Sequence, residues 1–289
     1  MELSFNGPPR ARFPGPVLSS ILGAALLWVL PAHAELSLFP TRIVLERNQR
    51  AAQVELMNRG TAAETYRIGL VNRRMTVDGD IVVAEAPQPD ERFADEMLRY
   101  SPRQVTIPPG QSQVVRILLR KPADLPDGEY RSHLQFDRVE DTSAATSVEA
   151  VGSAPAQGIG VVIRTLVGAS IPVIVRHGAT QVRVTLSELA LESRAGIPAP
   201  LLALQLQRQG NRSVYGDLSV SFTPAGGKAV ELAKAGGVAV YVPNASRRAR
   251  LPLELPKGLA LSDGVLQVSY RERPEAGGAL LAEAQLRLP

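Results

Sequence analysis

The sequence from Gly158 to Gly178, GIGVVIRTLVGASIPVIVRHG, alternates apolar side chains over a length well beyond the roughly five or six residues of an average strand. Successive side chains of a strand point to opposite faces, so every second residue shares a face. From Ile159 to Val175, the face formed by the odd-numbered residues is apolar except at Thr165. The pattern therefore predicts one long strand with a continuous apolar face. Its apolar members are Ile159, Val161, Ile163, Val167, Ala169, Ile171, Val173 and Val175.

The rest of the chain also favours strands. Residues 140–157, EDTSAATSVEAVGSAPAQ, are small, polar and aperiodic, which is typical of a loop. Short runs of period two, the first from Leu36 to Leu45, are separated by turns rich in Gly and Pro. Helical periodicity is nearly absent. Strands at this spacing predict an all-β protein of two sandwich domains, which we expect at residues 35–172 and 173–289.

Residues 1–34 have the pattern of an export signal. Arg10 and Arg12 precede an apolar run from Val17 to Leu30, and the triplet Ala32-His33-Ala34 follows. A basic start, a short apolar segment and a small-x-small triplet predict a secretory signal peptide cleaved after Ala34. The apolar run is shorter than the roughly 20 residues that span a bilayer, which disfavours a membrane anchor. We expect no membrane insertion once the signal is removed.

Composition argues against several kinds of chemistry. The chain has no cysteine, which excludes disulfides, thiolate metal sites and cysteine nucleophiles. His133 and His177, the histidines outside the signal, are not spaced as metal ligands. Ser132 and His133 are neighbours on an expected strand, so they face opposite sides and cannot form a triad with Asp137. We expect a protein that is not an enzyme and has no metal or cofactor.

The charge pattern gives little support to nucleic-acid binding. The formal net charge is +4, but basic and acidic residues are interspersed and no polybasic block is present. Aromatic residues, on which bases could stack, make up only 4% of the chain. We therefore expect no nucleic-acid partner.

Four segments of the first domain, in order, resemble periplasmic pilus-assembly chaperones, the PapD-like family of the chaperone–usher pathway. The details are most similar to the archaic, spore-coat-like subgroup. The second domain is similar to the family only in length and β character. The segments are LFPTRIVLE (38–46), SPRQVTIPPGQSQVVRILLRKP (101–122), LPDGEYRSHLQF (125–136) and IPVIVRHG (171–178).

The resemblance implies two immunoglobulin-like domains in a boomerang arrangement. In that family a pilus subunit is a sandwich that lacks its last strand, and the chaperone fills the open groove with alternate residues of its own long strand. This donor-strand complementation is a form of β-augmentation. The alternative is that these side chains fill the protein's own core. The implied donor residues are Ile159, Val161, Ile163 and Val167.

The resemblance also assigns a role to Arg42. In the family, the arginine of a Thr-Arg pair on the first strand anchors the C-terminal carboxylate of the subunit, for which a planar guanidinium is well suited. From composition alone, a solvated arginine is the simpler interpretation. P-pilus relatives add a lysine on the long strand, but the matching position here is Pro172. Arg164, Arg176 or backbone groups would have to replace that lysine.

Glu129 and Arg176 match two members of a buried ionic cluster that sets the angle between the domains in P-pilus relatives. The third member is an acidic residue of the second domain, for which Glu272 is a candidate. Ordinary surface placement of these charged residues is the alternative.

These features together predict a periplasmic chaperone for fimbrium biogenesis and cell wall organisation. We expect it to bind pilus subunits and deliver them to an outer-membrane usher. An exposed apolar strand also favours self-association of the free protein. The alternative is a structural pilus or adhesin module of tandem immunoglobulin-like domains. Such a module would usually carry a donor segment ahead of its first domain, whereas here the Thr-Arg strand follows the expected signal almost directly.

Overall fold

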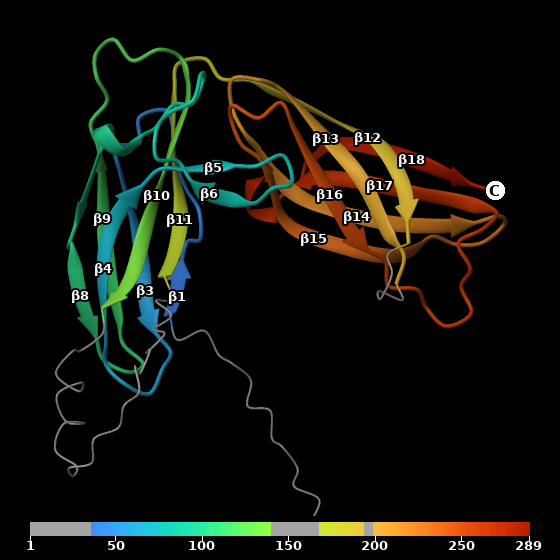
Figure 1. Ribbon diagram of the computed structural model, residues 1–289, viewed down its shortest axis with the longest axis horizontal. Coiled ribbons are helices and arrows are strands. Elements are labelled where there is room, and N and C mark those ends of the chain that lie inside the picture. The colour runs from blue at the N-terminus through green and yellow to red at the C-terminus, as the bar shows by residue number, and fades with distance from the viewer. Residues whose placement is uncertain (1–35, 140–167, 194–198) are drawn as a thin grey trace, which may run out of the picture. The chain divides into compact units, whose positions relative to one another are not determined.

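The computed structural model describes residues 36–139, 168–193 and 199–289, which form strands β1 to β18 and two short 3₁₀ helices, η1 (Asp95–Met97) and η3 (Pro274–Ala276) (Figure 1). The strands build two β-sandwiches, so the all-β, two-domain prediction is confirmed. The expected signal peptide lies outside the described residues. So do all four candidate donor residues, Ile159, Val161, Ile163 and Val167.

The first sandwich has a four-stranded and a five-stranded sheet. All neighbouring strands in it are antiparallel except β2 and β11, which run parallel. The four-stranded sheet has the order β1 (Leu36–Phe39), β3 (Ala51–Asn58), β9 (Ser112–Leu119) and β7 (Leu98–Ser101). The five-stranded sheet has the order β2 (Ile43–Leu45), β11 (Gly168–His177), β10 (Gly128–Val139), β4 (Glu64–Val71) and β8 (Gln104–Ile107).

The chain changes sheets between β1 and β2. The sequence predicted one strand from Leu36 to Leu45, and this prediction is wrong. β1 pairs with β3 in one sheet, whereas β2 pairs with β11 in the other. Pro40 lies between them and has no N–H to donate to a ladder, so it interrupts the pairing. Thr41 and Arg42 therefore lie in a connection between the two sheets rather than inside a strand.

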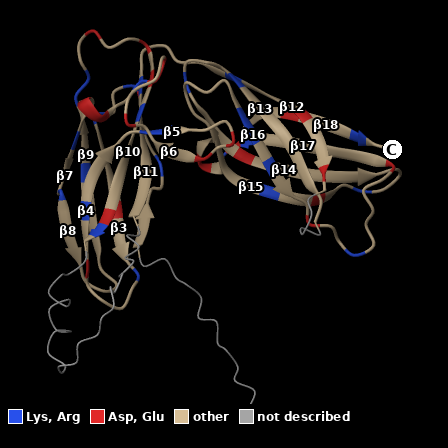
Figure 2. Cartoon of the chain, in the orientation of Figure 1, with Lys and Arg blue, Asp and Glu red and all other residues tan. Residues whose placement is uncertain are grey.

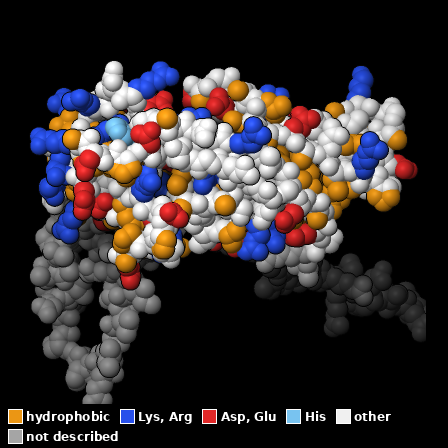
Figure 3. Space-filling view, turned by 90° about the horizontal axis from the view of Figure 1, so that it is seen from above, with side chains coloured by type: hydrophobic (Ala, Val, Ile, Leu, Met, Phe, Trp, Pro, Cys, Tyr) orange, Lys and Arg blue, Asp and Glu red, His pale blue; other side chains and the backbone are white. Residues whose placement is uncertain are grey.

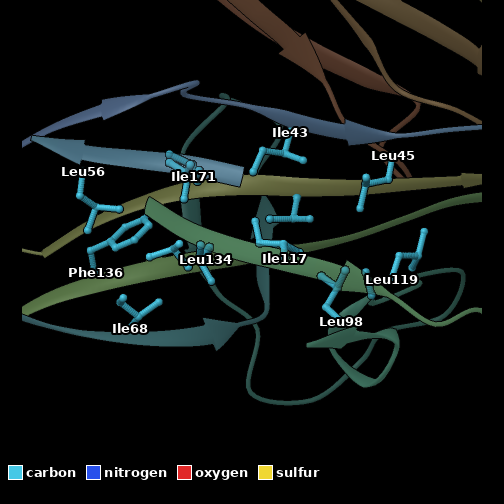
Figure 4. Close-up of a cluster of buried hydrophobic side chains, with 14 of the residues drawn as sticks. Ile43, Leu45, Leu56, Ile68, Leu98, Ile117, Leu119, Leu134, Phe136 and Ile171 are labelled. Atoms are coloured by element: carbon cyan, nitrogen blue, oxygen red, sulfur yellow. The ribbon is translucent and has the colours of Figure 1, made fainter. Parts of the chain in front are cut away.

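Alternate side chains of β10 and β11 fill the core of this sandwich. Leu134 and Phe136 of β10 are fully buried, and Ile171 of β11 lies beside them (Figure 4). Val173 and Val175 continue the same face of β11 and are also fully buried. Burial of a large aliphatic side chain contributes about 1.5–3 kcal/mol. In this part of the long strand, the apolar face stabilises the protein's own core.

The structure places the end of β11 later than the expected domain boundary. β11 pairs with β10 from Gly168, opposite Asp137, to His177, opposite Gly128. Residues 173–177 therefore continue the pairing of β11 with β10. Pro172 does not end the strand, because a proline is tolerated where a strand lies at the edge of a sheet.

The second sandwich has a three-stranded and a four-stranded sheet. Its core lies between them and includes Leu206 of one sheet and Phe222 and Tyr270 of the other. The three-stranded sheet has the order β12 (Val182–Glu192), β13 (Leu201–Gly210) and β16 (Ser246–Pro252). The four-stranded sheet has the order β15 (Val230–Val240), β14 (Val214–Pro224), β17 (Gly264–Glu272) and β18 (Leu280–Leu288).

A separate hairpin of the first domain, β5 (Arg73–Met75) and β6 (Ile81–Val83), contacts the second sandwich. The side-chain amide of Asn244 donates to the carbonyl of Met75 at 2.9 Å, and the backbone N–H of Arg248 donates to the carbonyl of Val77 at 2.7 Å. These bonds lie within one compact unit, Ala34–Pro289. The hairpin thus ties backbone of the first sandwich to side chain and backbone of the second.

Candidate functional site

Along half the length of β11, one edge has no partner strand in the part of the chain that the structure describes. On one side β11 pairs with β10 throughout, but on the other it pairs with β2 only at Val173–Val175, opposite Ile43–Leu45. From Gly168 to Pro172, no strand among the described residues pairs with that second side. An unpaired edge presents free backbone N–H and C=O groups to which another strand can be added.

Arg42 lies where this unpaired edge begins. It directly precedes Ile43, the first residue of β2, which is opposite Val173. Its guanidinium carbon lies 4.4 Å from the centre of the Tyr215 ring and 5.8 Å from that of Tyr241. Stacking on an aromatic ring leaves the in-plane N–H groups of an arginine free to bind an acceptor.

Two nitrogens of Arg42 lack a hydrogen-bond partner among the residues that the structure describes. Nε and Nη2 are buried, and neither has a hydrogen-bond partner within the described part of the chain. Buried donors of this kind are uncommon, and leaving one unsatisfied costs about 1–3 kcal/mol or more for a charged group. Nε and Nη2 lie along one edge of the guanidinium, and such an edge pairs with both oxygens of a carboxylate.

Arg42 lines a cavity of about 810 Å³ that receives residues from both sandwiches. The lining carries both signs of charge, with four arginines and three glutamates. Charges of both signs are also interspersed along the strands of both sandwiches (Figure 2). The face shown in Figure 3 likewise mixes apolar, basic and acidic side chains. The charged residues that line the cavity are Arg42, Glu46, Arg176, Arg212, Glu272, Arg273 and Glu275.

Arg176 and Glu129 form an ion pair, with Nε of Arg176 3.1 Å from Oε2 of Glu129. Arg176 also pairs with Glu46 at 3.0 Å. Glu129 is almost fully buried and accepts hydrogen bonds from the backbone N–H of Ser213, at 3.1 Å, and from the Ser213 hydroxyl. The cluster therefore joins strands β10 and β11 of the first sandwich to a turn of the second.

The second domain contributes a serine to this cluster rather than an acid. Glu272 lines the cavity, but Arg176 pairs with Glu46 and Glu129, and no ion pair joins it to Glu272 among the described residues. Ser213 carries no charge, and 84 residues separate it from Glu129, so the sequence gives no local signal for this contact.

The ring of Tyr241 contacts two arginines, Arg131 and Arg42. The guanidinium carbon of Arg131 lies 4.0 Å from the centre of its ring, and Arg42 approaches the same ring. Burial lowers the pKa of Arg131 and raises the pKa of the Tyr241 hydroxyl. Tyr241 also packs against Met75 and Ile174 of the first domain. Sequence reasoning missed Tyr215, Tyr241 and Arg131, because isolated residues on strands carry no pattern that marks them as neighbours.

The residues that could supply a second positive charge beside Arg42 differ in whether they are already paired. Pro172 lies opposite His133 and supplies no charge. Arg176 is already paired with two carboxylates. Arg164 lies outside the described residues. Arg212 lines the cavity, and its Nε is buried without a hydrogen-bond partner in the described ranges.

His133 and Ser132 face opposite sides of β10, as expected for neighbours on a strand. The Ser132 hydroxyl accepts a hydrogen bond from the Ala94 N–H at 2.9 Å and donates one to Asn72 at 2.7 Å. His133 is 3% exposed, and its Nδ1 has no partner among the described residues. Burial, with smaller contributions from the charges of Arg131 and Arg73, lowers the pKa of His133 to about 3.

This depressed pKa predicts acid sensitivity. Between about pH 6.5 and pH 3 the unfolded chain binds a proton at His133 that the folded protein does not, so stability falls as pH falls through this range. From pH 7 to 4.5 the loss from this group is about 2–3 kcal/mol. We expect His133→Gln to remove that part of the loss, measured by urea unfolding at both pH values. The half-buried His177 provides the control, His177→Gln, which should retain the loss; equal acid sensitivity of His133→Gln and the parent protein would contradict the prediction.

Comparisons with known proteins give a likeness of fold only. No family model and no curated protein matches the chain. Among solved structures, the YadV chaperone is similar with 12% identity and a TM-score of 0.45, over 88% of this chain and 100% of that one. The CsuC–CsuE chaperone–tip adhesion subunit complex of Acinetobacter baumannii is similar with 13% identity and a TM-score of 0.44, over 89% of this chain and 100% of that one. The E. coli chaperone DraB is similar with 17% identity and a TM-score of 0.40, over 88% of this chain and 96% of that one. At these scores, the similarities do not assign an activity to the chain.

No group of three or more His, Cys, Asp or Glu side chains in the described ranges is arranged to hold a metal ion. Over the same residues, no helix has both the length and the apolar character that a membrane crossing requires.

Proposed function

We propose that this protein is a periplasmic chaperone that binds pilus or fimbrial subunits and completes their sandwich with its own edge strand. The observation that carries the proposal is an edge of β11 at Gly168–Pro172, with one edge of the Arg42 guanidinium at its end, neither of which has a partner among the described residues. An open backbone edge and a free carboxylate-binding group at one place suit the capture of a strand that ends in a carboxylate.

In this proposal the donor strand continues from β11 toward its N-terminal side. The buried face of Ile171, Val173 and Val175 has the same parity as Ile159, Val161, Ile163 and Val167. Continued alternation would direct these four side chains to one face, where each contributes about 1.5–3 kcal/mol when an apolar groove buries it. The backbone edge binds whatever the sequence of the subunit, because its hydrogen bonds involve main-chain groups alone.

Arg42 anchors the C-terminal carboxylate of the subunit in this scheme. The carboxylate would accept hydrogen bonds from Nε and Nη2, which have no partner among the described residues. The ring of Tyr215, 4.4 Å away, would hold the guanidinium plane in position. Phe39, which is 75% exposed and lines the same cavity, offers an apolar contact to the incoming strand. The ion pair of Glu129 and Arg176 would fix the two domains around the cavity.

The cellular part of the proposal follows the resemblance to the PapD-like family and its archaic subgroup. An exported chaperone would meet its subunits in the periplasm and pass them to an outer-membrane usher. When free, it would cover its apolar strand by self-association. YadV and CsuC, which are similar to this chain in fold, are themselves chaperones, and CsuC is found in complex with the tip adhesion subunit CsuE.

Co-expression with a small exported pilin-like subunit tests the proposed function. A chaperone should leave a size-exclusion column as a 1:1 complex with the subunit, and the subunit should aggregate or be degraded when the chaperone is absent. Recovery of this protein in assembled fibres instead would indicate a structural pilus or adhesin module. A subunit that stays soluble and unbound in both conditions would contradict the chaperone role.

A further inference from the structure

We propose that Arg212, in the turn between β13 and β14, is the second cation of the carboxylate site and that both domains therefore build this site. The inference rests on the proposed function, since it names the partner of Arg42 in carboxylate anchoring.

The charge pairing in the cavity singles out Arg212. Four arginines line it. Arg176 pairs with Glu129 and Glu46, and Arg273 pairs with Asp217 at 3.4 Å and Glu275 at 3.3 Å. Arg42 and Arg212 are the two that have no carboxylate partner within the described residues, and each has a buried Nε without a hydrogen bond. An anion is the ligand that would satisfy both.

Hydrogen bonds of Arg212 and of the next residue hold the backbone of the turn that carries Arg212. The carbonyl of Arg212 accepts a hydrogen bond from Nη1 of Arg208 at 3.1 Å. The next residue, Ser213, donates twice to the buried carboxylate of Glu129 in the first domain. Two residues further on, Tyr215 lies against Arg42. The backbone of this turn is thus held by the protein, while the guanidinium of Arg212 remains available to a ligand.

The chemistry of two such guanidinium groups favours a free carboxylate over its amide. Arg42 can pair with both oxygens through Nε and Nη2, and Arg212 adds a second charge-assisted bond. A terminal amide has no net charge and offers one acceptor oxygen, so it would lose most of this interaction. Because both arginines are partly buried, salt should screen the interaction less than it screens a fully exposed pair on the surface.

A peptide pair provides the test. The probe is a fluorescein-labelled peptide of 12 residues or so, with alternating valine and threonine after two lysines, made with a free C-terminal carboxylate and as the C-terminal amide. We expect Arg212→Gln in the full chain to weaken binding of the acid peptide about tenfold and to change binding of the amide less than about twofold, measured by fluorescence anisotropy. Arg212→Lys should recover part of the loss. The control is Arg183→Gln, which removes an exposed arginine of β12 in the same domain.

Arg42→Gln distinguishes failure of this inference from failure of the proposed function. If Arg42→Gln weakens binding of the acid peptide and Arg212→Gln binds like the parent protein, Arg212 is not the second cation, while the role of Arg42 stands. If the parent protein binds neither peptide, or binds both equally, carboxylate anchoring itself is wrong. An unchanged thermal unfolding midpoint in each variant assigns its effect to binding rather than to folding.

Discussion

Ile163→Asp is expected to abolish stabilisation of the subunit while leaving the protein folded. In the proposed complex, Ile163 inserts into the open groove of a subunit. The substitution removes about 1.5–3 kcal/mol of apolar burial and adds the larger cost of placing an unpaired carboxylate in an apolar site. We expect the co-expressed subunit to aggregate or to be degraded. The measurement is the amount of soluble 1:1 complex recovered by size exclusion, which should fall to background.

Val162→Asp provides the matched control, since it introduces the same charge one residue away. Alternation assigns residue 162 to the other face of the strand, so this variant should still yield complex. Equal loss of complex in both variants would contradict insertion of one face. Normal recovery with Ile163→Asp would contradict donation by this residue and favour the alternative that the apolar face serves the protein's own core.

Glu129→Ala is expected to lower the free energy of unfolding by about 3–5 kcal/mol, the usual cost of breaking a buried ion pair. The Glu129 side chain is 1% exposed and accepts hydrogen bonds from Arg176 and from both the N–H and the hydroxyl of Ser213. Its removal leaves these donors without their acceptor. Guanidinium unfolding measures the effect. Because the cluster joins the two sandwiches, we also expect the variant to unfold in two separate transitions.

A surface ion pair supplies the comparison. Glu192 pairs with Arg250 at 2.9 Å, and both side chains are more than 40% exposed. Exposed pairs of this kind contribute about 0–1 kcal/mol, so Glu192→Ala should change the stability little. If Glu129→Ala destabilised the protein no more than Glu192→Ala does, the cluster would not hold the domains together.

The local sequence pattern was sufficient to predict strands and the faces they bury. Period-two alternation predicted that Ile171, Val173 and Val175 share a face, and the structure buries all three in one core. The alternation was readable because side-chain direction in a strand depends only on residue parity. Strand ends were less well predicted. Pro40 interrupts an alternating run, and β11 continues through Pro172 to His177, because the partner strand decides where pairing stops.

By itself, then, the sequence determined the all-β class and the buried face of β11, and it identified Arg42 as a candidate carboxylate anchor. The tertiary structure alone decided what surrounds that arginine: Tyr215 against its guanidinium, Arg212 in the same cavity, and Ser213 on Glu129. The physical reason is that these partners come from the other sandwich. These contacts depend on how the two folded domains pack against each other, and local sequence patterns do not predict that packing.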